Sequence, residues 1–225
     1  MKALTTFIAI ALLAFSTTAC SQQHTYRSGG FGSKTVKASK NYVTKDIKVN
    51  NFTKLSVAGS PDVTYTQKSG KPTVEVYTSD NIVDLLDIRV KDNTLYIGFK
   101  KNVSVSYNKL EVRVSAEKLN GIAVAGSGDV ELKNVTANFT KASVAGSGTA
   151  ILSGSTQEAE YSVAGSGDLF ASDFVAKKAS ASVAGSGDIK CHATDFLKVR
   201  TSGSGCVGYK GNPELDYPKK GLYKL

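Results

Sequence analysis

Apolar and polar residues alternate with a period of two along much of the chain, which is the pattern of strands with one buried face. Val74 and Val76 fall on one face in this way, and so do Val112 and Val114. The clearest alternation predicts strands at 62–67, 73–78, 94–99 and 110–115. Strand patterns dominate from residue 46 onward, so the chain is expected to be almost entirely β.

One short segment departs from this pattern. Residues 81–87 are preceded by Ser79 and Asp80, and either of these two residues is a suitable N-cap for a helix. The apolar side chains that such a helix would turn inward are Ile82, Leu85 and Leu86. This segment is the only helix that the sequence predicts.

A six-residue motif recurs in the second half of the chain. V-A-G-S-G-D and its variants begin at Val124, Val144, Val163, Val183 and Thr201. The steps between copies are 20, 19, 20 and 18 residues, and a further relative, V-A-G-S-P-D, begins at Val57. A nearly fixed period of this length is typical of a solenoid, in which each repeat is one coil stacked on the previous coil.

Aligned on this motif, the repeats show four columns of mostly apolar residues. The two columns before the turn are Ile122, Ala142, Tyr161, Ala181 and Val199, then Val124, Val144, Val163, Val183 and Thr201. The two after it are Val130, Ala150, Leu169, Ile189 and Val207, then Leu132, Leu152, Ala171, Cys191 and Tyr209. Such columns predict strands that stack at about 4.8 Å with their inner faces forming a continuous core.

The turn inside each motif has an expected structural role. Glycine reaches positive φ without penalty, so both glycines of each G-S-G are expected to form a sharp corner. The turn residues are Gly126, Ser127, Gly128, Gly146, Ser147, Gly148, Gly165, Ser166, Gly167, Gly185, Ser186 and Gly187. Stacked serines, ending with Ser204, would form a hydroxyl ladder, and the Asp after the turn would accept bonds from local amides.

These patterns predict an all-β fold, a right-handed parallel β-helix-like solenoid with coils of about 20 residues. The solenoid is expected at 116–225, and a strand-rich N-terminal segment at 46–115 precedes it and packs against or extends it. Residues 20–45 are rich in Ser, Gly, Lys and Thr without apolar periodicity, which indicates a flexible linker.

The first residues carry a targeting signal. Residues 1–19 combine a basic start, an apolar run and small residues, which is typical of a signal peptide. Cys20 then resembles the lipidated cysteine of bacterial lipoproteins, although Thr17 stands where Leu is usual. The expected location is the outer membrane or cell surface through a lipid anchor, with a periplasm-facing orientation as the alternative. An ordinary secreted protein is the other interpretation.

The chain is basic, with 28 Lys and Arg against 19 Asp and Glu and a net charge of +9. A nucleic-acid partner is not expected, because the signal directs the protein out of the cytoplasm. Several lysines follow the anchor, namely Lys34, Lys37, Lys40, Lys45 and Lys48. They either contact anionic lipid head groups or belong to a solvated tether.

The repeats resemble a known family. The run G-I-A-V-A-G-S-G-D-V at 121–130, its later copies, D-N-T-L-Y-I at 92–97 and Y-K-G-N-P at 209–213 resemble the putative auto-transporter adhesin, head GIN domain, of envelope lipoproteins from Gram-negative bacteria. The resemblance covers nearly all of 46–225. It implies a β-helix-like solenoid on an exported protein and a role in adhesion, and it provides no catalytic residues.

Three aspartates occupy the same corner of different repeats, Asp129, Asp168 and Asp188. They are candidate ligand contacts, and adjacent carboxylates are suitable for binding Ca²⁺ or for acid/base cleavage of a glycan. Thr149 interrupts the series and Cys206 ends it, and no Arg or His recurs beside the corner. The favoured interpretation is therefore a turn-forming role, with no catalytic residue, no metal and no cofactor.

Cys191 and Cys206 occupy different positions of successive repeats. The predicted register places their Cα atoms roughly 10–11 Å apart, which is too far for a disulfide. Two free thiols are therefore expected, with a disulfide as the alternative. The histidines, His24 and His192, lack partners at metal-ligand spacing, so no zinc site is expected.

The favoured function is a non-enzymatic binding or adhesion module that presents a repetitive surface to a glycan or a protein. The first alternative is a structural envelope or assembly component. The second is a polysaccharide-active β-helix enzyme that uses Asp168 and Asp188. The sequence leaves the oligomeric state open.

Overall fold

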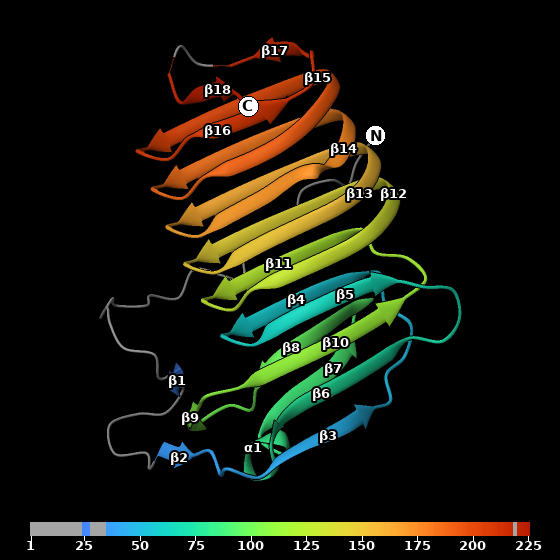
Figure 1. The fold of residues 1–225 in the computed structure, drawn as a ribbon, viewed down its shortest axis with the longest axis vertical. Helices are drawn as coiled ribbons and strands as arrows, with labels where there is room; N and C mark the ends of the chain where they lie inside the picture. Colours follow the sequence, from blue (N-terminus) through green and yellow to red (C-terminus); the bar gives the residue numbers. More distant parts are fainter. Residues whose placement is uncertain (1–23, 28–34, 218–219) are drawn as a thin grey trace.

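The protein is an all-β stack of strands (Figure 1). The computed structural model describes residues 24–27, 35–217 and 220–225. The predicted signal peptide at 1–19 and the predicted lipidation site at Cys20 lie outside the described residues. Within those residues, one sheet contains 15 strands and a second, small sheet contains three.

The first part of the chain forms short strands and one helix. They are β1 (His24–Arg27), β2 (Thr35–Lys37), β3 (Tyr42–Ile47), β4 (Lys54–Gly59), β5 (Asp62–Gln67), β6 (Thr73–Ser79), α1 (Asp80–Val83), β7 (Leu86–Lys91), β8 (Thr94–Phe99), β9 (Ser104–Tyr107) and β10 (Leu110–Ala116). The four predicted strands correspond to β5, β6, β8 and β10. Val74, Val76, Val112 and Val114 are buried, as the alternation predicts.

The repeats form longer strands. They are β11 (Gly121–Gly126), β12 (Val130–Gly146), β13 (Thr149–Gly165), β14 (Asp168–Gly185), β15 (Ile189–Gly203), β16 (Val207–Lys210), β17 (Glu214–Asp216) and β18 (Leu222–Lys224). Each of the long strands β12–β15 curves round between one G-S-G and the next (Figure 1). We call one such strand with its turn a rung, and the turn itself a corner.

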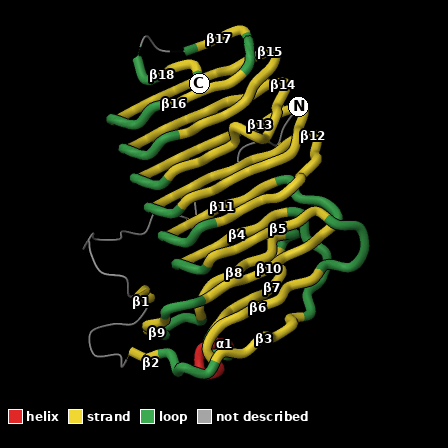
Figure 2. Tube along the Cα trace, in the orientation of Figure 1, coloured by secondary structure: helices red, strands yellow, loops and turns green. Residues whose placement is uncertain are grey.

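Successive rungs pair in parallel and in register. The stack has two faces, named after the halves of the long strands. The second face contains β4, β11 and the second halves of β12–β15. The first face begins with β5, which pairs with the first half of β12. The first halves of β13, β14 and β15 follow in order, and then β16 and β18. The corners form one column along the edge of the stack (Figure 2).

The motif at Val57 belongs to this stack. Val57 on β4 pairs with Val124 on β11, which in turn pairs with Val144 on β12. The first motif is therefore the rung directly below the second, although β6–β10 separate the two along the chain. The N-terminal segment extends the stack through β4 and β5.

The four predicted inward columns form the core. Every member is buried except Thr201 and Tyr209, which are half-buried in the last rungs. The pairing follows the predicted alignment, since Ala142, Tyr161 and Ala181 are successive partners across β12, β13 and β14. Alignment on the glycines was therefore sufficient to identify the buried face of every rung.

The segment between the first two rungs closes the N-terminal end of the stack. β10 pairs in parallel with β5 and antiparallel with β6, and β6 pairs antiparallel with β3. On the second face, β8 pairs with β4 and β7 pairs antiparallel with β8. These antiparallel pairs end the parallel array near β3 and β7.

Two sequence predictions for this region differ from the structure. The helix α1 ends at Val83, because Leu86 pairs with Phe99 as the first residue of β7. Ile82 and Leu86 are nevertheless buried. Part of the stretch interpreted as a linker also forms strands, since β2 pairs with β9 and β3 with β6. Val43 and Ile47 of β3 pack against the core with few apolar neighbours in sequence, so composition alone did not reveal this strand.

The C-terminal end has shorter strands. β17 pairs with β15 and β18 pairs with β16, so the last rung is built from separate short pieces. Large apolar side chains are exposed here, at Tyr217, Tyr223 and Leu225. The ring of Tyr223 lies against Gly208 of β16.

Two buried tyrosines differ in their hydrogen bonding. The Tyr65 hydroxyl donates to the carbonyl oxygen of Ala116 at 2.9 Å. The Tyr161 hydroxyl is fully buried and has no hydrogen-bond partner among the described residues. Burial also raises the pKa of Tyr161 above its ordinary value. Its hydroxyl therefore carries a desolvation cost that no hydrogen bond offsets.

Tyr161→Phe is expected to increase the free energy of unfolding by about 1–3 kcal/mol, because it removes an unsatisfied buried hydroxyl. Tyr65→Phe is the matched control and is expected to lower it by about 1 kcal/mol. Urea denaturation of the two variants measures both changes. Equal losses of stability in the two variants would contradict this account of Tyr161.

Candidate functional site

The corners are built by close approach of one backbone to the next. The first glycine of each G-S-G has positive φ, between 112° and 134°, at Gly126, Gly146, Gly165, Gly185 and Gly203. The second glycine does not, so positive φ explains only the first glycine of each corner. A Cβ on either glycine would lie less than 3.0 Å from backbone atoms of the preceding rung. Both positions therefore exclude a side chain, and only the first also depends on φ.

Hydrogen bonds explain this close approach. At each corner one glycine carbonyl accepts two amides from the next rung, at 2.8–3.1 Å. The carbonyl of Gly146, for example, accepts from the amides of Ser166 and Gly167. The serine side chains are exposed at every corner, and the hydroxyl ladder remains a prediction. The backbone, rather than the serine hydroxyl, makes the contact that repeats along the column.

The three predicted aspartates have a repeated role at the same corners. One carboxylate oxygen of Asp129 accepts the amide of Thr149 at 3.0 Å. Asp168 accepts from the amide of Asp188, and Asp188 from that of Cys206, each at 2.8 Å. The sequence predicted a bond from an amide of the aspartate's own turn, whereas the bonded amide belongs to the next rung. Each aspartate therefore links two rungs.

Thr149 breaks the aspartate series, as the sequence indicated. Without a carboxylate at this position, the amide of Asp168 donates instead to the carbonyl of Gly148 at 3.2 Å. In the part of the chain that the structure describes, no group of three or more His, Cys, Asp or Glu side chains is arranged to hold a metal ion. The geometry of the aspartates thus accounts for a linking role without a ligand.

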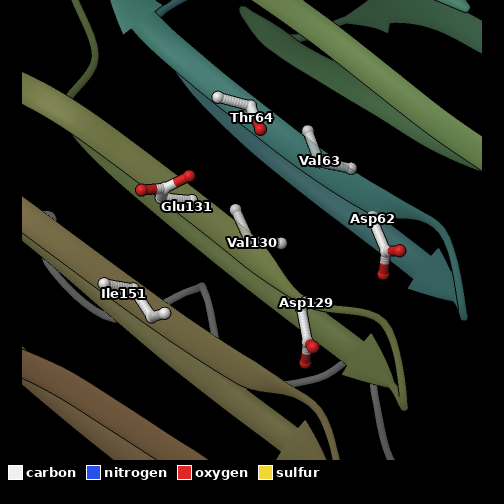
Figure 3. A pocket seen from close by; sticks show the side chains of 7 residues that line it. All are labelled: Asp62, Val63, Thr64, Asp129, Val130, Glu131 and Ile151. Atoms are coloured by element: carbon white, nitrogen blue, oxygen red, sulfur yellow. The ribbon is translucent and has the colours of Figure 1, made fainter.

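A small hollow lies beside the first of these corners (Figure 3). It has a volume of about 200 Å³, and Asp62 and Asp129 lie at the same end of neighbouring strands there. Its other lining residues are Val63, Thr64, Val130, Glu131 and Ile151. The hollow is shallow, and carboxylates in its lining already have partners, since Glu131 pairs with Lys133 and one Asp129 oxygen accepts an amide.

The two cysteines are free thiols, as predicted. Cys191 is fully buried in its inward column, and burial raises the pKa of its thiol to about 12. Cys206 is half-buried at the last corner. His192 is half-buried on the strand of Cys191. A neutral thiol of such high pKa acts as a small apolar core residue rather than as a nucleophile.

A larger groove, which the sequence did not reveal, runs across the second face. It has a volume of about 500 Å³ and is shallow, and it is more open to solvent than the hollow beside Asp129. Its lining comprises Phe139, Glu158, Ala159, Glu160, Tyr161, Ser162, Lys178, Ala179, Ser180, Ser182, Phe196 and Lys198. Phe139 has 44% of its surface exposed, so this aromatic ring faces solvent rather than the core. The feature of the sequence that could have revealed this groove is an aromatic residue, Phe139, at an outward position of the repeat.

Gly165→Ala is expected to destabilise the protein by at least about 2 kcal/mol more than Gly70→Ala. Both glycines have positive φ, at 121° and 113°, but a Cβ on Gly70 meets nothing within 4 Å. The difference between the variants therefore isolates the cost of crowding between rungs. Thermal and urea unfolding measure this difference in stability. Equal losses of stability in the two variants would show that φ alone explains the repeated geometry of the corner.

Asp168→Ala is expected to cost about 1–3 kcal/mol, because the amide of Asp188 loses its acceptor in a half-buried position. Asp168→Asn keeps a side-chain oxygen and is expected to cost less. Asp173→Ala serves as the control, since its carboxylate is exposed and lies 3.5 Å from Lys210 Nζ. Urea denaturation compares the three, and an Asp168→Ala variant as stable as the control would refute the linking role.

Known proteins share this fold. The crystal structure of a putative adhesin from Bacteroides fragilis is 32% identical, with a TM-score of 0.67 over 84% of this chain and 95% of that chain. A protein from Parabacteroides distasonis described as a putative lipid binding protein is 24% identical, with a TM-score of 0.62 over 85% of this chain and 100% of that chain. At that identity the second likeness concerns the fold alone.

A putative adhesin from Parabacteroides merdae also has the fold, at 21% identity and a TM-score of 0.54, over 84% of this chain and 95% of that chain. The comparison with curated proteins gave no match. The family model described as putative auto-transporter adhesin, head GIN domain, matches residues 51–213. Because the match covers most of the chain, the protein belongs to the putative auto-transporter adhesin, head GIN domain, family.

Proposed function

We propose that the protein is a non-enzymatic binding or adhesion module of the cell envelope, and that its stack is a right-handed solenoid with coils of about 20 residues. The parallel, in-register pairing of β11–β15 supports the solenoid. The family and the similar Bacteroides fragilis structure are both described as putative adhesins, which supports a binding role.

The observation that carries this proposal is the regular presentation of outward side chains. Because the rungs pair in register, the residues Phe139, Glu158, Lys178 and Phe196 form one outward column across four successive rungs. A rigid surface with side chains at a repeated spacing suits an extended partner, because little conformational freedom is lost on binding. The groove on the second face lies along this column.

The enzymatic alternative depends on Asp168 and Asp188. An acid/base pair requires carboxyl oxygens that are available to substrate and water. One oxygen of each residue accepts an amide from the next rung, at 2.8 Å. This use of the carboxylates favours the linking role and argues for a binding function over glycan cleavage.

The proposal includes export and a lipid anchor on Cys20. The described residues contain no helix long and apolar enough to cross a membrane. Attachment would then come from the lipidated cysteine that follows the signal peptide at 1–19. Exposed lysines of the N-terminal end, such as Lys37, Lys40 and Lys48, would lie on the membrane side of the stack.

A cell-surface binding module must be accessible and must bind. Protease added to intact cells is expected to digest the protein while a periplasmic control survives.

Cys20→Ser is expected to abolish incorporation of a palmitate analogue. The unlipidated mature chain is expected to bind saturably to at least one member of a panel of immobilised glycans and extracellular matrix proteins.

Failure to bind any member of this panel, together with protection from protease in intact cells, would refute the surface-binding role. That pair of results would favour the structural envelope or assembly component. Turnover of a polysaccharide that is lost in Asp168→Asn, while the variant remains folded, would favour the enzyme.

A further inference from the structure

The groove on the second face has aromatic rings at both ends. Phe139 lies on β12, and Phe196 lies on β15, in the same outward column and on the same groove. Three strand spacings separate them, or roughly 14 Å along the stack. A ligand that contacts both rings must therefore be extended and must lie parallel to the axis of the stack.

The charges that line the groove are balanced. Its lining includes two glutamates, Glu158 and Glu160, and two lysines, Lys178 and Lys198. Glu160 also forms an ion pair with Lys141 of the neighbouring rung. The whole chain carries a net charge of +9, yet this groove presents no excess of either sign. The lining itself therefore contributes no net attraction for a polyanion or a polycation.

The polar groups that line the groove are suitable for hydroxyl ligands, and two of them, Glu158 and Lys178, lie between the rings in the same column. Ser162, Ser180 and Ser182 line the groove, and each hydroxyl both donates and accepts hydrogen bonds. The lysines add donors and the glutamates add acceptors.

Aromatic rings complete the match to a sugar chain. One face of a pyranose ring carries mainly C–H groups, which pack against an aromatic face and remove apolar surface from water. We propose that the groove binds a neutral, unbranched glycan segment, which stacks on Phe139 and Phe196 and hydrogen-bonds to Glu158 and Lys178 between them and to Ser180 beside them. This inference rests on the proposed binding function and specifies its site and ligand class.

The test measures the affinity of the mature chain for defined oligosaccharides. The neutral probes are cellohexaose, xylohexaose, mannohexaose and maltohexaose, and the charged probes are oligosaccharides of hyaluronan and heparin. Phe139→Ala and Phe196→Ala are each expected to weaken binding of a neutral probe about tenfold. Ser180→Tyr, which places a bulky side chain beside the column that joins the two rings, is expected to abolish it.

Phe170→Ala is the matched control. Phe170 is a half-buried outward phenylalanine on the first face, where its ring contacts Lys190, and it lies outside the groove. This variant is expected to bind the neutral probe as tightly as the unmodified chain. Thermal unfolding of every variant separates a loss of the site from a loss of the fold.

The outcomes separate the two proposals. Neutral-glycan binding that the groove variants weaken and Phe170→Ala leaves unchanged supports the inference. Neutral-glycan binding that the folded groove variants leave unchanged overturns this site, and binding of only charged glycans or proteins overturns the ligand class. In both of those cases the proposed binding function stands. Absence of binding to every glycan overturns the inference, and absence of binding to the matrix proteins as well, together with protection from protease in intact cells, overturns the proposed function.

Discussion

The structure depends on the close approach of successive backbones at the G-S-G corner. One carbonyl, such as that of Gly146, accepts two amides from the next rung, and no space remains for a side chain on either glycine. This contact repeats at a fixed position of every rung, so it also sets the register of the strands that follow. A slip of one residue would place a side chain where only hydrogen fits and would turn the apolar columns outward.

The core follows from that register. Large and small residues are neighbours in the inward columns, and Tyr161 lies between Ala142 and Ala181 on the adjoining rungs. The alanines leave the space that the tyrosine ring occupies, which keeps the interior closely packed. The aspartates reinforce the same edge, because Asp168 and Asp188 each accept an amide from the rung above. Backbone, core and corner side chains therefore stabilise one alignment.

The repeats could be read from the sequence because an apolar period of two on both sides of a fixed turn defines the buried face without knowledge of distant contacts. Three features required the structure. The rung at Val57 is separated from its partner Val124 by an inserted segment, and helix α1 is shortened because Leu86 pairs with Phe99. The groove was missed because Phe139 faces outward, and an alignment based on inward columns gives no information about that face.

The rigidity of the corner bears directly on a binding role, because a surface of fixed spacing depends on rungs that do not shift. Hydrogen exchange of individual amides in the full chain tests this most directly. The account predicts that the amides of Ser166 and Gly167, although they lie in a turn with an exposed serine, exchange as slowly as the amide of Val163 in the adjoining strand. Exchange as fast as that of the exposed turn at Gly70 would contradict the claim that the corners hold the stack in register.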